Sequence, residues 1–137
     1  MHDGLSPVLL KAIQKEFQCA RCETIGARQV NLGRLGPAAI VWDGGEGQCG
    51  ATGNCDFYLL YRDETGIRSI QINNGWNYAI VKSRTDVPDI VFMANMYMTH
   101  RSGWVQRYSF VHGAFVLSGC DFVDLVTIKP CQSEGPD

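Results

Sequence analysis

The sequence predicts an α+β domain in which an N-terminal helix packs on a curved antiparallel sheet or a partly closed β-barrel of about seven strands, stapled by disulfides. Three observations support this fold class: an apolar stripe at helical spacing near the N-terminus, a series of strand-like segments with turn signals every ~8–12 residues, and six cysteines. The 137 residues suit one domain, 1–137, and nothing along the chain reads as an interdomain linker.

The helix is expected within residues 5–22. Ser6 supplies a capping hydroxyl and Pro7 occupies the first helical position, which is a common way for a helix to begin. Val8, Leu9 and Ile13 then start an apolar stripe at helical spacing, which continues to Phe17. Residues 23–37 follow as a linker that contains Gly33, Gly36 and Pro37.

An antiparallel β-meander is predicted over residues 38–128. Strands are expected at 38–42, 56–62, 67–72, 76–81, 89–98, 104–110 and 114–117, with a glycine-rich loop at 43–54 and turns at 63–66, 73–75, 101–103 and 112–113. These segments predict a core made of apolar and aromatic residues, namely Ile40, Val41, Phe57, Leu59, Ile70, Ile72, Ile90, Phe92, Tyr108, Phe110, Phe115 and Leu117.

Composition and charge disfavour several classes of protein. Hydrophobic residues make up 45% of the chain and charged residues 19%, as in a globular protein. The net charge is −2 and the basic residues are scattered, so nucleic acid is not an expected partner. The apolar runs are too short to span a bilayer. The oligomeric state is not indicated by the sequence.

The even number of cysteines predicts three disulfides. Nearest-neighbour pairing gives Cys49–Cys55 around the glycine loop, Cys120–Cys131 around the apolar segment at 121–128 and Cys19–Cys22 after the helix. The main alternative sends Cys19 and Cys22 to different partners in the sheet. Redox catalysis is disfavoured because this Cys-x-x-Cys closes a helix rather than opening one, and structural zinc is disfavoured because Cys49 and Cys55 are too far apart for a close ligand pair.

A disulfide framework also predicts where the protein works. Disulfides persist in oxidising compartments, so we expect a secreted or periplasmic protein whose leader has been removed. A cytosolic protein with reduced cysteines is the alternative.

Three segments carry a resemblance to known proteins. They are the Cys-Gly-x-x-Gly-x-Cys loop at 49–55, the Val-Pro-Asp-Ile-Val-Phe step at 87–92 and the late step at 108–115. Over about residues 38–119 the chain resembles small exported bacterial domains, most of them uncharacterised, whose strands are loosely similar to FG-GAP or propeller-type repeats. The clustered aspartates of calcium-binding FG-GAP repeats are absent. The resemblance implies an exported setting and little about activity.

The sequence favours a non-catalytic binding or inhibitor-type module of unknown ligand, which uses the disulfide-held glycine loop. A rigid loop on a sheet scaffold is a common recognition surface, and exposed aromatic residues anchor protein or carbohydrate partners. The candidate binding residues are Trp42, Asp43, Glu46, Trp76 and Trp104.

Two alternatives stay open. A small hydrolase acting on cell-wall or extracellular polymer would use Asp43 and Glu46 as paired carboxylates with a histidine. A periplasmic copper-binding protein would use Met96, Met98 and His100, whose thioether and imidazole groups suit copper(I). The favoured interpretation is that these methionines fill a core, so we expect no catalytic residues, no metal and no cofactor.

Overall fold

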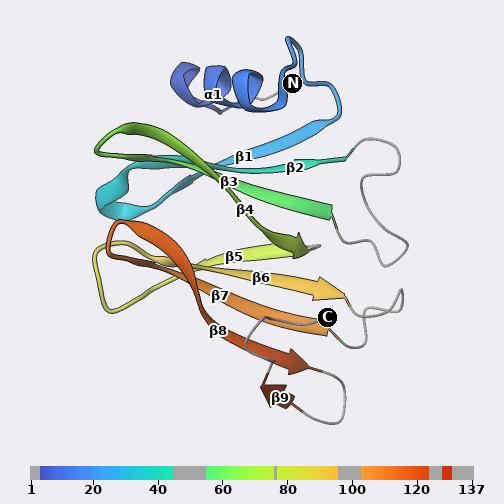
Figure 1. Ribbon diagram of the computed structural model, residues 1–137, viewed down its shortest axis with the longest axis vertical. Coiled ribbons are helices and arrows are strands. Elements are labelled where there is room, and N and C mark those ends of the chain that lie inside the picture. The colour runs from blue at the N-terminus through green and yellow to red at the C-terminus, as the bar shows by residue number, and fades with distance from the viewer. Residues whose placement is uncertain (1–3, 45–54, 76, 96–102, 124–127, 131–137) are drawn as a thin grey trace. The chain divides into compact units, whose positions relative to one another are not determined.

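The computed structural model describes residues 4–44, 55–75, 77–95, 103–123 and 128–130, which divide into two compact units. The first unit comprises residues 1–49 and 55–73, and the second comprises 50–54 and 74–137. Within the described residues the chain forms one α-helix and nine strands, and the strands make one antiparallel sheet of four and another of five (Figure 1). The predicted mixture of one helix with antiparallel strands is therefore present.

The prediction of one curved sheet or partly closed barrel is wrong, because the described strands divide into two sheets and neither closes on itself. Alternation within a strand reports which side chains share a face, but it does not report where one sheet ends and the next begins. The expectation of one domain over residues 1–137 stays a prediction.

The first unit contains α1 (Pro7–Phe17), β1 (Ile25–Asn31), the short 3-10 helix η1 (Gly33–Leu35), β2 (Pro37–Asp43), β3 (Cys55–Asp63) and all but the last two residues of β4 (Gly66–Gly75). Its sheet has the order β1-β2-β3-β4. The second unit contains β5 (Asn77–Val81), β6 (Asp89–Asn95), β7 (Gly103–Val111), β8 (Ala114–Val123) and β9 (Ile128–Pro130), which form a sheet in that order.

Helix α1 begins as predicted and ends earlier than predicted. The Ser6 hydroxyl accepts a hydrogen bond from the Leu9 N–H at 3.2 Å, and Pro7 is the first helical residue. The helix stops at Phe17 because Gln18 adopts a left-handed conformation with φ of 52°, which reverses the chain. The expected helical range of 5–22 is therefore too long at its C-terminal end.

Strand β1 is the main element that the sequence did not predict. It occupies Ile25–Asn31, in the segment expected to be a linker, and pairs antiparallel with β2. Its polar residues Arg28 and Gln29 are exposed, as expected for an edge strand, and they hide the alternation that normally reveals a strand. The Gln29 side chain also accepts a hydrogen bond from the Ser6 N–H at 2.7 Å, which ties the start of α1 to this strand.

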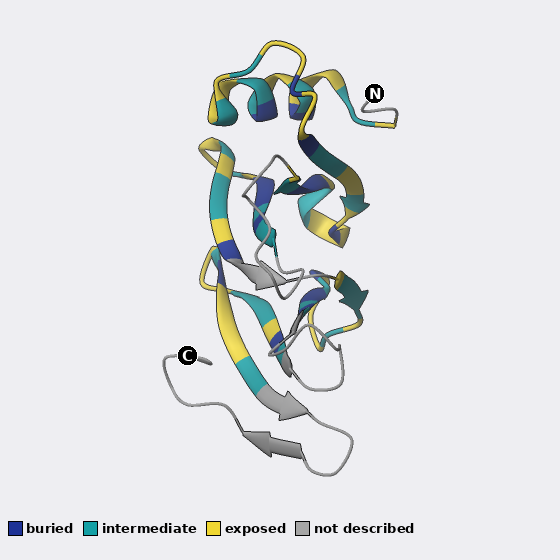
Figure 2. Ribbon diagram, turned by 90° about the vertical axis from the view of Figure 1, so that its right-hand side faces the viewer, coloured by how far each residue is buried: buried dark blue, intermediate teal, exposed yellow. Residues whose placement is uncertain are grey.

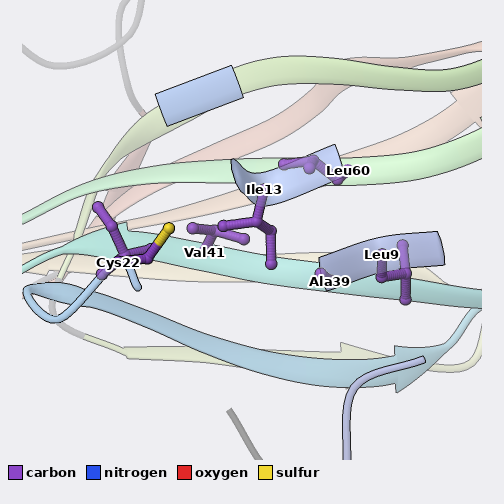
Figure 3. Packing of buried hydrophobic residues seen from close by; sticks show 7 residues of the cluster. Leu9, Ile13, Cys22, Ala39, Val41 and Leu60 are labelled. Atoms are coloured by element: carbon purple, nitrogen blue, oxygen red, sulfur yellow. The ribbon is translucent and has the colours of Figure 1, made fainter. Parts of the chain in front are cut away.

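The core of the first unit lies between α1 and one face of the sheet (Figure 3). The helix contributes Leu9 and Ile13, which are 2% and 0% exposed, while its outer side is exposed (Figure 2). The sheet and the preceding turn contribute the remaining buried members of this cluster, Cys22, Ile25, Ala39, Val41 and Leu60. Burial of this apolar surface is what holds a single short helix in place.

Strands β2 and β3 are apolar on both faces. Val41 and Leu60 face the helix, whereas Ile40 and Leu59 pair across the strands on the opposite face, and all four are buried. Such continuous apolar runs are typical of central strands, which agrees with the position of β2 and β3 inside the sheet.

The turn between β3 and β4 is held by the carboxylate of Asp63. Its Oδ1 accepts hydrogen bonds from the Thr65 hydroxyl at 2.7 Å and the Thr65 N–H at 2.8 Å, and its Oδ2 lies 3.2 Å from Nε of Arg68. The Thr65 bonds, helped by Arg68, hold the pKa of Asp63 below its ordinary value. The charged form is therefore the one that stabilises the fold.

This turn predicts a pH-dependent loss of stability in Asp63→Asn. Because the folded pKa is depressed, the contribution of Asp63 is complete above its unfolded pKa of about 3.9 and is lost as pH falls through the lower folded value. The stability difference between wild type and Asp63→Asn, measured by urea unfolding, should be largest near neutral pH and shrink below about pH 4.

Glu64→Gln is the matched control, since it removes the same charge from an exposed position in the same turn. A difference in the free energy of unfolding between wild type and Asp63→Asn that stays constant from neutral pH to pH 3 would show that the pKa of Asp63 is not lowered in the folded protein.

The core of the second unit centres on Phe92. Its ring lies 6.1 Å from that of Tyr78 on β5 and 5.9 Å, edge to face, from that of Tyr108 on β7, and Phe92 is fully buried beside Ile90. Burial raises the pKa of Tyr108 above its ordinary value.

The other face of this sheet carries an ion pair between a buried carboxylate and an exposed arginine. The carboxylate of Asp89, 8% exposed, accepts a hydrogen bond from Nε of Arg107, and Nη2 of Arg107 donates to the carbonyl of Lys82 at 3.1 Å. A buried carboxylate is tolerated because it has such a partner.

The predicted turn at 112–113 is present and joins β7 to β8. His112 and Gly113 both have positive φ, 52° and 84°, as a two-residue hairpin loop requires. Further along this strand pair the register shifts between Arg107 and Tyr108, where the Ser118 hydroxyl donates to the Arg107 carbonyl at 3.2 Å.

The predicted core is largely correct. Eight of the twelve predicted residues are buried, and these are Ile40, Val41, Phe57, Leu59, Ile72, Ile90, Phe92 and Phe115. Ile70, Tyr108 and Phe110 are half-buried. Leu117 is 38% exposed, so its assignment to the core is wrong.

Candidate functional site

The candidate site lies at one end of the first unit, where β2 leads into the glycine-rich loop. The C-terminal end of α1, the start of β1, the end of β2 and the start of β3 all lie at this end, on the right of Figure 1. The loop leaves β2 after Asp43 and returns at Cys55, and its residues 45–54 lie outside the described part. The site can therefore be built from the strands that hold the loop and from the turn beside them.

Trp42 stabilises the stem of this loop, which consists of the end of β2 and the start of β3. It pairs with Gly26 on β1 and with Phe57 on β3, and its ring lies 5.9 Å from the Phe57 ring at 60°. The indole passes so close to Gly26 that a Cβ at this position would overlap it. Trp42 was predicted as a binding residue, and the structure places its half-buried ring against the sheet, where it stabilises the stem.

Asp43 connects the stem to the turn that precedes β1. Its Oδ1 lies 3.5 Å from the Thr24 hydroxyl, and the N–H of Gly44 donates to the Thr24 carbonyl at 2.8 Å. The first residue of the loop is therefore bonded to the chain between α1 and β1.

The turn between α1 and β1 is closed by the Cys19–Cys22 disulfide. Nearest-neighbour pairing is correct for these two cysteines, and the alternative that sends them to different partners is excluded. Cys22 also has a positive φ of 54° and is 4% exposed, packed in the core cluster with Leu9 and Ile13. The disulfide thus fixes the turn directly on the core.

The other two described cysteines are oxidised as well. Cys55 and Cys120 are both disulfide-bonded, and none of the described cysteines is free. Their predicted partners, Cys49 and Cys131, lie outside the described residues, so these two pairings stay predictions.

A groove of about 330 Å³ lies between this turn and the loop stem. Phe17 and Cys19 line one side, Arg21, Glu23 and Thr24 line the turn, and Asp43 lines the stem. Phe17 is fixed by an edge-to-face contact with Tyr58, whose ring centre lies 5.0 Å away. The groove therefore has a packed aromatic wall and a polar rim.

Several carboxylates lie near Tyr58 at this end of the first unit. Burial raises the pKa of Tyr58, and the nearby carboxylates of Asp56, Asp43 and Glu16 raise it further. The Arg21 guanidinium lies 3.9 Å from Glu23, and both side chains are largely exposed. An acidic rim of this kind favours a partner that offers cationic or hydrogen-bond-donating groups.

The structure brings together only some of the predicted site residues. Trp42 and Asp43 lie at the loop stem, whereas Glu46 and Trp76 lie outside the described residues. Trp104 lies in β7 of the second unit. The proposed pairing of Asp43 with Glu46 for hydrolysis stays a prediction.

The copper alternative also stays a prediction, because Met96, Met98 and His100 all lie outside the described residues. Among the residues that are described, no three His, Cys, Asp or Glu side chains group closely enough to hold a metal ion. No described helix is long and apolar enough to cross a membrane.

The sequence did not predict that the Cys19–Cys22 turn would form one wall of the groove. The feature of the sequence that indicated this turn was the Cys-x-x-Cys spacing directly after an amphipathic helix. What the sequence did not reveal is that β1 follows this turn and pairs with β2, which brings Thr24 and Asp43 together.

Comparison with known proteins finds no match to this chain among protein-family models, curated proteins or solved structures.

Proposed function

We propose that the protein is an exported, non-catalytic binding module that recognises a protein partner through the β2–β3 loop and the groove at its base. The observation that carries the proposal is the groove of about 330 Å³ between the Cys19–Cys22 turn and the loop stem. Binding residues are commonly found on loops that a rigid scaffold positions, and this groove lies where the scaffold meets the loop.

Rigidity at the base of the loop supports recognition. The disulfide fixes the turn, the Thr24 carbonyl binds the N–H of Gly44, and Trp42 packs on Gly26 and Phe57. A surface that is ordered before it meets its partner loses less conformational entropy on binding.

The oxidised cysteines support the exported setting. Each of the four described cysteines is disulfide-bonded, and such bonds persist in secreted or periplasmic proteins, whereas cytosolic reductants keep thiols reduced.

The charge of the rim indicates the chemistry of the partner. Asp43 and Glu23 line the groove with one arginine, and the raised pKa of Tyr58 reports additional acidic groups nearby. A lysine or arginine side chain of a protein partner would be attracted to this rim, which a neutral carbohydrate would not exploit.

The test is a binding measurement with two variants of the loop end. Wild-type protein is immobilised and used to capture proteins from periplasm or culture medium, and the captured protein is purified for measurement of its dissociation constant. Asp43→Asn should weaken binding about tenfold, which corresponds to ~1.4 kcal/mol. Cys49→Ser with Cys55→Ser should weaken it further by releasing the loop.

Glu64→Gln is the matched control, because it removes one negative charge from the β3–β4 turn, at the other end of β3. Circular dichroism checks that each variant is folded. Equal affinity of wild type and both loop-end variants would exclude this surface, and capture of polysaccharide rather than protein would redirect the proposal to a carbohydrate ligand.

A further inference from the structure

A second groove, of about 510 Å³, runs along α1 on the first unit and is separate from the loop stem. Its floor is apolar, since it is made by Leu60 of β3 and Ile67 of β4 with Ala12 and Val8 of the helix. The volume falls within the range of about 300–1,000 Å³ that is typical of small-molecule sites.

The apolar part of this groove is not fully covered. Val8 is 47% exposed and lines the groove on the helix side. Leu60 belongs to the core cluster under α1 and Ile67 packs against that cluster, so the floor of the groove is rigid. An apolar ligand could therefore bury surface here without rearranging the sheet.

The rim of the groove is cationic. Lys11 and Lys15 lie one helical turn apart on the same side of α1, and both are exposed. Neither lysine forms an ion pair within the described part of the chain. Glu16 also lines the groove, which leaves one positive charge in excess.

We propose that this groove binds a small amphipathic carboxylate of the fatty-acid class. The hydrocarbon chain lies on Leu60, Ile67 and Ala12, while the carboxylate is attracted to Lys11 and Lys15. The excess positive charge selects an anion over an alcohol or a cation of the same chain length.

The experiment uses the whole chain with its disulfides intact and a fluorescent fatty acid, dansyl-undecanoate. Dansyl emission should rise saturably as protein is added, and decanoate should displace the probe. Decanol should compete about tenfold more weakly, and decyltrimethylammonium more weakly still. Lys11→Gln with Lys15→Gln should weaken probe binding about tenfold.

Lys82→Gln is the matched control, because it removes an exposed positive charge from the second unit and should leave binding unchanged. Ala12→Phe should block the groove. The lysine variants keep the proposal testable if that bulkier variant does not fold, since both lysines are exposed.

Two results would overturn the proposal: absence of saturable probe binding to wild type, or equal competition by decanoate and decanol together with unchanged binding by the double lysine variant. Asp43→Asn should leave fatty-acid binding intact, so this test is independent of the one for the loop.

Discussion

Replacing Phe92 with alanine is expected to lower the free energy of unfolding by about 3–5 kcal/mol. The side chain is 0% exposed, and it contacts the rings of Tyr78 and Tyr108 on the two neighbouring strands. Truncation removes the apolar surface of a whole ring and leaves a cavity between two side chains that are held by their own strands. The loss therefore includes both the hydrophobic stabilisation that the buried ring provided and the free-energy cost of the cavity.

Urea unfolding followed by circular dichroism measures this loss. Leu117→Ala on β8 is the control, because Leu117 is 38% exposed and its truncation should cost less than about 1 kcal/mol. Similar losses in the two variants would show that Phe92 is not the centre of the second unit's core.

Ile13→Ala should destabilise the protein by about 2–5 kcal/mol. Ile13 is 0% exposed and packs with Val41 and Leu60 beneath the helix. Alanine favours the helical conformation more than isoleucine does, so any loss arises from packing against the sheet and not from the helix itself.

Val8→Ala is the matched control for this variant. It truncates a β-branched residue on the same helix at a position that is 47% exposed, and its stability should stay within about 0.5 kcal/mol of wild type. Equal effects of Ile13→Ala and Val8→Ala in urea unfolding would mean that α1 is not anchored through the face described above.

Local sequence patterns predicted the individual elements well. Ser6 and Pro7 located the start of α1, and His112 with Gly113 located the β7–β8 turn, because capping and positive φ depend on the residues at those positions themselves. The apolar runs of β2 and β3 likewise identified Ile40 and Leu59 as core residues.

What could not be predicted depends on which strands pair. The edge strand β1 shows only weak alternation, and its pairing with β2 is a contact between distant segments that no local pattern reports. The division of the described strands into two sheets likewise depends on which distant segments pair. Leu117 on β8 pairs with Tyr108 and shares a face with the buried Phe115, yet it is 38% exposed, because alternation reports the face of a residue and not how far that face is covered.

In the candidate site, too, the features of one continuous segment could be predicted, whereas contacts between distant segments could not. The glycine loop and Asp43 were visible because they form one continuous segment. The groove was not, because it needs the Cys19–Cys22 turn and the end of β2 to meet through the pairing of Ile25 with Asp43.

The contact between Gly26 and Trp42 restricts the order in which these two positions can change during evolution. A side chain at Gly26 would overlap the indole of Trp42, so substitution at Gly26 is tolerated only after Trp42 has become smaller. The reverse order meets no such barrier, since loss of the indole leaves space beside a glycine. Homologous sequences should therefore show covariation between these two positions, with the change at Trp42 coming first in each lineage.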